Sequence, residues 1–205
     1  MYAGYRDAEY VALREHYEPG YAAVNAVLTK AVRYTDLVEA FLLPHVQLPV
    51  DLLDWGGDTG ANSPFKQHHR RWDIFDISGA APVVGARAVS RSEAEQGGYS
   101  LVVCSQVLEH VSWPLLVLRE MVGVMDEQTV LYVELPHEAL IREGARLPEQ
   151  KRHWHEHVNF FTRRAIEEMV VRVGLEILAF RDDNYVSIGD RRGYLFQVAL
   201  RKAPA

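Results

Sequence analysis

A short apolar run that ends in a glycine-rich turn constrains the fold of this 205-residue chain more than any other feature. The run is Val50–Leu53, and the turn Asp54–Gly60 (DWGGDTG) follows it at once. Gly56, Gly57 and Gly60 allow the chain to turn tightly after a buried strand and let its backbone approach a ligand. The segment therefore predicts an α/β fold that binds a small molecule at a strand end.

Apolar runs and amphipathic segments alternate along the rest of the chain. Further strands are predicted at Trp72–Phe75, Val83–Val89, Leu101–Cys104, Val130–Leu135, Leu175–Phe180 and Tyr194–Leu200. Helices are predicted at Pro114–Met125 and at Arg163–Val173, the second between the N-cap Thr162 and the terminating Gly174. This alternation predicts a mostly parallel sheet with helices on both faces. Only the turn-rich segment Asp182–Gly193 separates the last two strands, so they are expected to pair antiparallel at one edge.

Helical patterns come before the first strand. Asp7–Tyr17 and Tyr21–Leu43 are the candidates, and Pro44 and Pro49 separate the second from the sheet. We therefore expect residues 1–49 to form a helical cap or lid and residues 50–205 to form the ligand-binding domain. Five tyrosines in the cap either stack on a substrate or simply pack: Tyr2, Tyr5, Tyr10, Tyr17 and Tyr21.

Composition argues against several classes of protein. The net charge is −6, and the Lys and Arg residues are scattered rather than clustered, which disfavours nucleic acid as a partner. The single cysteine, Cys104, cannot form a disulfide within the chain and lies in an apolar run, as in a cytoplasmic protein. No apolar stretch is long enough to span a bilayer. A cytoplasmic enzyme acting on a small molecule is the expectation.

The glycine turn also discriminates between cofactors. A dinucleotide-binding G-x-G-x-x-G motif that starts at Gly56 would need glycine at positions 58 and 61, where the chain has Asp58 and Ala61. An acidic side chain inside the turn would also repel a pyrophosphate. Asp54, by contrast, complements an ammonium group such as that of a methionine moiety, directly or through water. The turn favours S-adenosylmethionine (SAM) over NAD.

An acid at the end of the second strand supports a nucleoside ligand. The Asp76 carboxylate, followed by Ile77, can accept hydrogen bonds from both ribose hydroxyls. Asp73 is the rival acid but falls at the start of the apolar run. Asp76 could alternatively serve as a helix cap or turn residue. The adenine end is expected near Ser90, in the loop after the third strand.

The fourth strand leads into Leu108-Glu109-His110-Val111 with Pro114 three residues on, and this segment resembles that of many small-molecule class I SAM-dependent methyltransferases. The resemblance implies that Cys104, Ser105 and Gln106 flank the cofactor, although Cys104 also suits a core position. It further implies that Glu109 and His110 fix the loop or touch the substrate. Some relatives have a metal-binding glutamate where this chain has Gln106, so no metal is expected.

A histidine-rich segment, His153–Thr162, carries the next resemblance. His153, His155 and His157 alternate, and a zinc site on their common side is a minority interpretation because no cysteine is near. The segment resembles the H-E-H-x-N-F-F-S/T stretch of bacterial methyltransferases from sugar and surface-polysaccharide pathways. The resemblance implies that a neutral histidine acts as general base, with His157 preferred over His155 and His110. Alternatively the histidines are polar loop groups; Phe160 and Phe161 are expected in the core and Thr162 as a cap.

The resemblance to this one family covers most of residues 50–180. It implies a seven-stranded Rossmann-like sheet and transfer of the SAM methyl group to a hydroxyl, less readily a carbon or nitrogen, of a small acceptor such as a sugar or polysaccharide unit. Two alternatives stay open. Asp58 and Gln106 would also suit a non-catalytic SAM-binding module, and an NAD-dependent oxidoreductase is the third hypothesis. The sequence does not indicate an oligomeric state.

Overall fold

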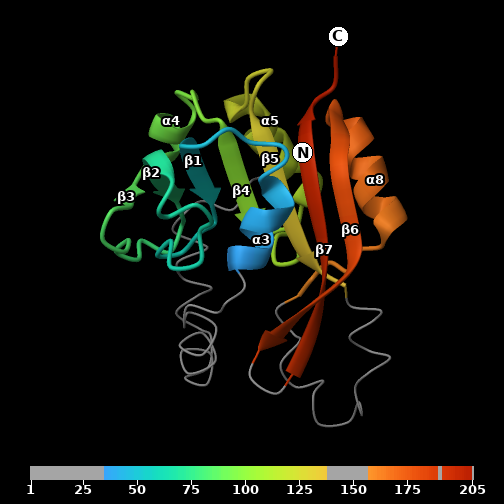
Figure 1. The fold of residues 1–205 in the computed structure, drawn as a ribbon. Helices are drawn as coiled ribbons and strands as arrows, with labels where there is room; N and C mark the ends of the chain where they lie inside the picture. Colours follow the sequence, from blue (N-terminus) through green and yellow to red (C-terminus); the bar gives the residue numbers. More distant parts are fainter. Residues whose placement is uncertain (1–34, 138–156, 189–190, 205) are drawn as a thin grey trace.

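A seven-stranded sheet forms the centre of the computed structural model, which describes residues 35–137, 157–188 and 191–204 (Figure 1). The strand order is β3-β2-β1-β4-β5-β7-β6. Strands β1 to β5 are parallel, whereas β7 runs antiparallel to both β5 and β6. The strands are β1 Val50–Trp55, β2 His69–Phe75, β3 Arg87–Ala88, β4 Leu101–Ser105, β5 Val130–Pro136, β6 Leu175–Ile188 and β7 Arg191–Lys202. The predicted Rossmann-like seven-stranded sheet with an antiparallel C-terminal pair is confirmed.

Helices cover both faces of the sheet, as the alternation of apolar segments predicted. On one face, Ala94 of α4, Leu118 of α5 and Ile166 of α8 belong to one buried apolar cluster. On the other face, Phe41 of α3 packs in a second cluster that includes Tyr132 of β5. The helices are α3 Thr35–Leu42, α4 Arg91–Ala94, α5 Pro114–Val124 and α8 Arg163–Arg172. Burial on both faces explains why the central strands are nearly continuous apolar runs.

The two crossovers nearest the glycine turn depart from the predicted alternation. Residues 56–68, between β1 and β2, and residues 76–86, between β2 and β3, contain turns and bends but no helix. The predicted strand Val83–Val89 is wrong in extent, because β3 has only two residues. Val83 instead donates its backbone N–H to Thr59 O at 2.9 Å, and Gly85 has φ +97°. Glycine and proline, which disfavour helix and strand interiors, recur in both crossovers.

The C-terminal hairpin is much longer than expected. The segment Asp182–Gly193 was predicted to be turn-rich, and this is wrong because β6 runs to Ile188 and β7 starts at Arg191. The register shifts between Arg181 and Asn184, at a bulge or irregularity in the ladder. A bulge lets a strand carry turn-forming residues such as aspartate while its pairing continues on either side.

The predicted cap is only partly described. Helix α3 confirms the end of the expected helix Tyr21–Leu43, and it stops before Pro44. The remainder of that helix and the expected helix Asp7–Tyr17 lie outside the described residues, as do the five cap tyrosines. Among the described helices, none has the length and apolar character needed to cross a membrane.

Candidate active site

The sheet changes direction between β1 and β4, and this is where the glycine turn lies. The chain leaves β1 toward β2 on one side and leaves β4 toward β5 on the other, and open α/β sheets bind their ligands at the carboxyl ends of strands that diverge in this way. The turns after β1 and β4 meet there, because a Cβ added to Gly56 would lie 2.5 Å from Val107 Cγ2. Gly56 also has φ +80° and donates its N–H to Phe75 O at 2.7 Å. Only glycine fits this close approach, so the opening feature of the sequence lies where an α/β sheet binds its ligand.

Asp54 lies beneath the glycine turn. Its carboxylate is buried and accepts a hydrogen bond from Ser63 Oγ at 2.5 Å. Burial raises the pKa of Asp54 to about 6. A Cβ on Gly57 would overlap this carboxyl group, so the backbone of the turn rests directly on it. The neighbouring Trp55 is buried and packs against the Phe75 ring at 4.6 Å.

Asp76 joins the turn after β1 to the turn after β2. Its Oδ2 accepts the N–H of Asp58 at 2.8 Å, and its Oδ1 accepts the N–H of Ser78 at 2.7 Å. A carboxylate has about four acceptor positions, so these two bonds are compatible with further bonds to ribose hydroxyls. Asp58, which departs from the expected glycine, has φ +52° and supplies one of the donors. This residue therefore takes part in building the turn.

The rival acid Asp73 has a structural role. It is buried, and it accepts hydrogen bonds from Arg87 Nε at 3.0 Å and from Tyr99 OH at 2.9 Å. Ile77 is exposed next to Asp76. Ser90 follows β3 and caps α4 in a reciprocal capping box with Glu93.

At the end of β4, two predicted cofactor residues bind the same buried acid. Ser105 Oγ and Gln106 Nε2 donate to Glu134 Oε1 at 2.8 and 3.2 Å, and Gln106 has φ +57°. Tyr132 OH donates to the other carboxylate oxygen at 2.5 Å. Cys104 is buried in the core, where desolvation raises the pKa of its thiol.

Sequence reasoning missed Glu134. The available signal was an acid inside the apolar run VLYVELP of β5. Burial raises the pKa of Glu134 from 4.5 to about 8.

Three of the four predicted catalytic residues come together beyond β4. Glu109 is fully buried, and its Oε1 lies 3.8 Å from His110 Nε2. The His110 and His157 rings are 4.7 Å apart between centroids and meet edge to face at 82°. One ligand atom from each of these three residues lies within 4.8 Å of the others. His153 and His155 lie outside the described residues.

The residues after His157 divide between packing and exposure. Phe161 is buried, and Thr162 caps α8 by accepting the N–H of Ala165, as predicted. Phe160 was expected in the core, and this is wrong because half of its side chain is exposed. Phe161, the next residue, is the one that packs into the core.

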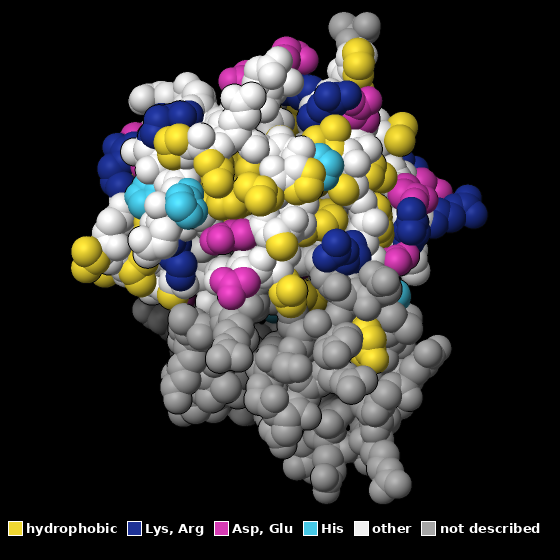
Figure 2. Space-filling model, in the orientation of Figure 1, with side chains coloured by type: hydrophobic (Ala, Val, Ile, Leu, Met, Phe, Trp, Pro, Cys, Tyr) yellow, Lys and Arg dark blue, Asp and Glu magenta, His cyan; other side chains and the backbone are white. Residues whose placement is uncertain are grey.

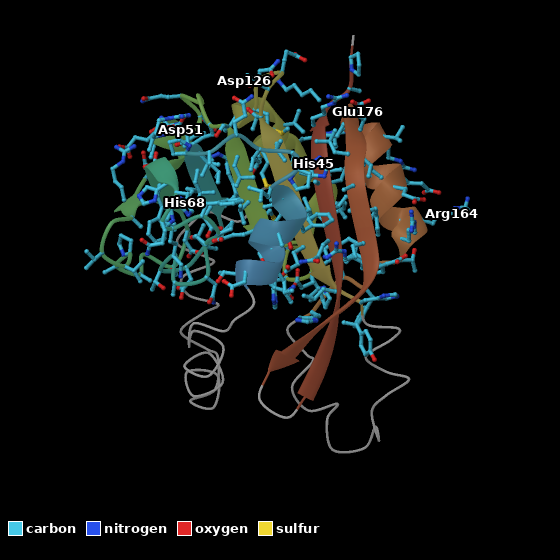
Figure 3. All side chains as sticks on the ribbon, in the orientation of Figure 1. His45, Asp51, His68, Asp126, Arg164 and Glu176 are labelled. Atoms are coloured by element: carbon cyan, nitrogen blue, oxygen red, sulfur yellow. The ribbon has the colours of Figure 1, made fainter. Side chains whose placement is uncertain are left out.

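The charged surface offers no stripe of cations on the face shown in Figure 2, where Lys and Arg side chains are interspersed with Asp and Glu. Asp51 and Asp126, labelled in Figure 3, lie at the amino edge of the sheet, Asp51 as the second residue of β1 and Asp126 before β5. Asp51 there pairs with Arg70. These acids are remote from the carboxyl edge, where the glycine turn, Asp76 and the histidines lie.

Solved structures share this fold. The 1,6-didemethyltoxoflavin-N1-methyltransferase of Burkholderia thailandensis, with bound 1,6-didemethyltoxoflavin and S-adenosylhomocysteine, has a TM-score of 0.67 at 15% identity, over 100% of this chain and 93% of that one. The magnesium protoporphyrin IX methyltransferase of Synechocystis PCC 6803, with bound SAM, has a TM-score of 0.59 at 15% identity, over 98% and 100%. The cyclase SpnF has a TM-score of 0.58 at 17% identity, over 84% and 81%.

A comparison with protein-family models identifies the family, which the shared fold alone does not. No curated protein matches the chain at a significant level. The model described as a methyltransferase domain matches residues 28–179, which is well over half of the chain. This range includes the glycine turn, Asp76, the β4 segment and His157. The chain therefore belongs to the methyltransferase-domain family and is a SAM-dependent methyltransferase.

Proposed function

We propose that this enzyme transfers the SAM methyl group to a hydroxyl of a small acceptor, a sugar or polysaccharide unit being the expected class. The observation that carries the proposal is the cluster of Glu109, His110 and His157 just beyond the end of β4. Imidazole is the side chain best suited to accept a hydroxyl proton near neutral pH. The carbohydrate class rests on the resemblance of the histidine-rich segment, since the structural neighbours act on other kinds of molecule.

Residues at the ends of four strands, β1 to β4, would hold the cofactor. The acid Asp76 suits the ribose hydroxyls, and Asp54 beneath the turn suits the methionine ammonium. The remaining positions are Trp55, Gly56, Gly57, Gly60, Ile77, Ser90, Cys104, Ser105 and Gln106. SAM supplies a methyl group already activated on a sulfonium, so the protein's task is mainly to align the acceptor for in-line attack.

The histidine cluster would manage the proton. His157 accepts the hydroxyl proton as the acceptor oxygen bonds to the methyl carbon and the bond from that carbon to sulfur breaks. Glu109 Oε1 lies 3.8 Å from His110 Nε2, so the Glu109 carboxyl would help to orient the imidazole pair. Neighbouring His155 is the alternative base.

The same cluster offers a second role. One carboxylate and two imidazoles with ligand atoms within 4.8 Å form a set that fits a divalent cation such as Zn²⁺. In this role, a bound cation would lower the pKa of the acceptor hydroxyl. In the first role, His157 would remove the hydroxyl proton. Metal analysis of the purified protein, and turnover after treatment with a chelator, separate the two roles.

The first experiment tests the reaction itself. Calorimetry with SAM and with S-adenosylhomocysteine measures cofactor binding, and mass spectrometry then follows methylation of free sugars and sugar nucleotides. We expect both binding and methylation. Binding without methylation of any acceptor would favour a non-catalytic SAM-binding module. Binding of NAD but not SAM would favour an oxidoreductase.

The variant His157→Ala tests the base. Turnover should fall by about 10²- to 10⁴-fold, the usual contribution of a general base, while the Kd for SAM changes less than about twofold. His68→Ala is the control, because His68 is exposed on the turn before β2 (Figure 3). Full turnover in His157→Ala would move the base to His155 or His110.

A further inference from the structure

Two segments far apart in the sequence are fastened together beside the histidine cluster. The backbone N–H groups of Val158 and Asn159 both donate to Glu109 O, at 2.8 and 3.1 Å. The Asn159 side chain adds two more bonds, from Nδ2 to Leu108 O at 3.0 Å and to Val111 O at 2.5 Å. Four hydrogen bonds thus join Val158–Asn159 to the turn Leu108–Val111, which we call the Asn159 clip.

The chemistry of the clip requires an asparagine. A carboxamide nitrogen carries two N–H donors, and both are used here on the carbonyls of Leu108 and Val111. An aspartate of the same shape has no such donors when ionised and would face two carbonyl oxygens with a negative charge. A serine has one donor and could satisfy only one carbonyl. The side chain is half-buried, so water would replace the lost bonds only in part.

The clip lies next to all three members of the cluster. Val158 directly follows His157, and its N–H is fixed on the carbonyl of Glu109. His110 is enclosed by the clipped turn, where its own N–H donates to Val107 O at 3.0 Å. Holding these two backbone segments together fixes the Cα positions from which the His110 and His157 side chains extend. The centroids of the two rings lie 4.7 Å apart.

We propose that Asn159 is a positioning residue for the methyl transfer, holding His157 against the Glu109–His110 pair without touching the acceptor. The inference rests on the proposed role of His157. A general base must lie within hydrogen-bond reach of the proton that it removes, and a displacement of about 1 Å costs on the order of 10²-fold in rate. Loss of the clip therefore affects the chemical step and leaves the proposed cofactor site, at the ends of β1 to β4, intact.

The test compares Asn159→Asp and Asn159→Ala with the wild type. We expect kcat to fall by about 10- to 100-fold in both, with the Kd for SAM within about twofold of wild type and an altered acid limb of the pH profile of kcat. Asn159→Ser, which keeps one donor, should lie between them and the wild type. Thr162→Ala is the control: it removes the α8 cap three residues on, so it lowers stability without loosening the clip.

The outcomes distinguish the positioning role of Asn159 from the general-base role of His157. Low turnover in His157→Ala together with wild-type kcat and pH profile in Asn159→Asp would overturn the clip alone. Full turnover in His157→Ala would overturn the base and, with it, the positioning role. A drop in kcat for Thr162→Ala as large as that for Asn159→Asp would overturn the clip as well, because destabilisation alone would then explain both. If Asn159→Ala and Asn159→Asp do not fold, wild-type kcat in Asn159→Ser would contradict the proposal.

Discussion

Asp76 connects two turns of the candidate cofactor site through one carboxylate. It holds the N–H groups of Asp58 and Ser78, and it is expected to accept the ribose hydroxyls. Asp76→Ala should weaken SAM binding by about 100-fold, from two lost bonds to a charged group at about 1.5 kcal/mol each. Asp76→Asn keeps one acceptor oxygen and should lose less. Calorimetry measures both, and an unchanged Kd in Asp76→Ala would reject the ribose assignment.

Gly57 permits the closest backbone approach in the turn. An added methyl group would overlap the Asp54 carboxyl, so Gly57→Ala should lower the free energy of unfolding by about 1–3 kcal/mol, the usual cost of overpacking. Gly123→Ala is the matched control, because Gly123 lies in α5 and an added Cβ meets no atom within 4 Å. Alanine there should be neutral or stabilising. Equal stability of Gly57→Ala and wild type in urea denaturation would contradict the contact.

Local spacing determines which site residues could be predicted from the sequence. Asp54 and Asp76 each end an apolar run, so both follow from a pattern within a few residues. Glu134 depends in part, and Asn159 wholly, on side-chain hydrogen bonds to partners that lie 28 or more residues away. Nothing beside Asn159 in the chain shows that it binds Leu108, and that relation exists only after folding.

At the scale of elements, one buried network links the end of β4 to β5 and to the middle of β7. Gln197 of β7 donates to Tyr132 OH at 2.8 Å, and Tyr132, Ser105 and Gln106 donate to Glu134. The network ties the end of β4, where the candidate cofactor residues Ser105 and Gln106 lie, to the antiparallel pair at the edge of the sheet. Its central carboxyl is 0% exposed, so its protonation bears on stability.

The raised pKa of Glu134 gives a pH dependence. The folded protein keeps this proton up to a pH of about 8, whereas the unfolded chain releases it near 4.5, so the folded state binds more protons in between. This group's contribution to stability is therefore present at low pH and is lost as pH rises from about 4.5 to about 8. Glu134→Gln, which cannot ionise, should lose less stability over that range than the wild type.

Urea denaturation at pH 5, 7 and 9 measures this difference. Exposed Glu127→Gln serves as the control and should follow the wild type. Burial also raises the pKa of Asp54, so this residue adds a pH dependence of stability in the same direction. Asp54 is present in the wild type and in both variants, so its contribution cancels in the comparison. Parallel pH curves for Glu134→Gln and the wild type would show that Glu134 is ionised throughout.

Helices and strands with a clear repeat of apolar residues were predictable from the sequence. Segments whose shape depends on contacts with distant parts of the chain were not. The helices α5 and α8 and the strands β1, β4 and β5 follow the apolar pattern closely. The short β3 does not, because Val83 bonds to Thr59 of the preceding crossover rather than to a strand. The hairpin of β6 and β7 continues through aspartates that usually mark a turn, because each strand pairs with the other.

At the scale of the whole molecule, the order of the elements predicted a mostly parallel sheet whose last two strands pair antiparallel. The family resemblance implied the seven strands that are observed. The acceptor is a different matter. Contacts to an acceptor come from loops whose sequences carry no general code, so the acceptor class stays a proposal for experiment.

The two ends of the sheet have consequences for how the protein behaves at high concentration. An edge strand offers unpaired backbone groups on which another chain can add, the usual start of aggregation. Edge β3 is only two residues long, and its Arg87 is anchored to Asp73, so it presents little template for such growth. Edge β6 is 14 residues long, but its ladder is irregular at Arg181–Asn184, where Asp182 pairs with Arg163. The shortness of β3 protects one edge of the sheet from fibre-like association. The irregular ladder and the charged side chains of β6 protect the other edge.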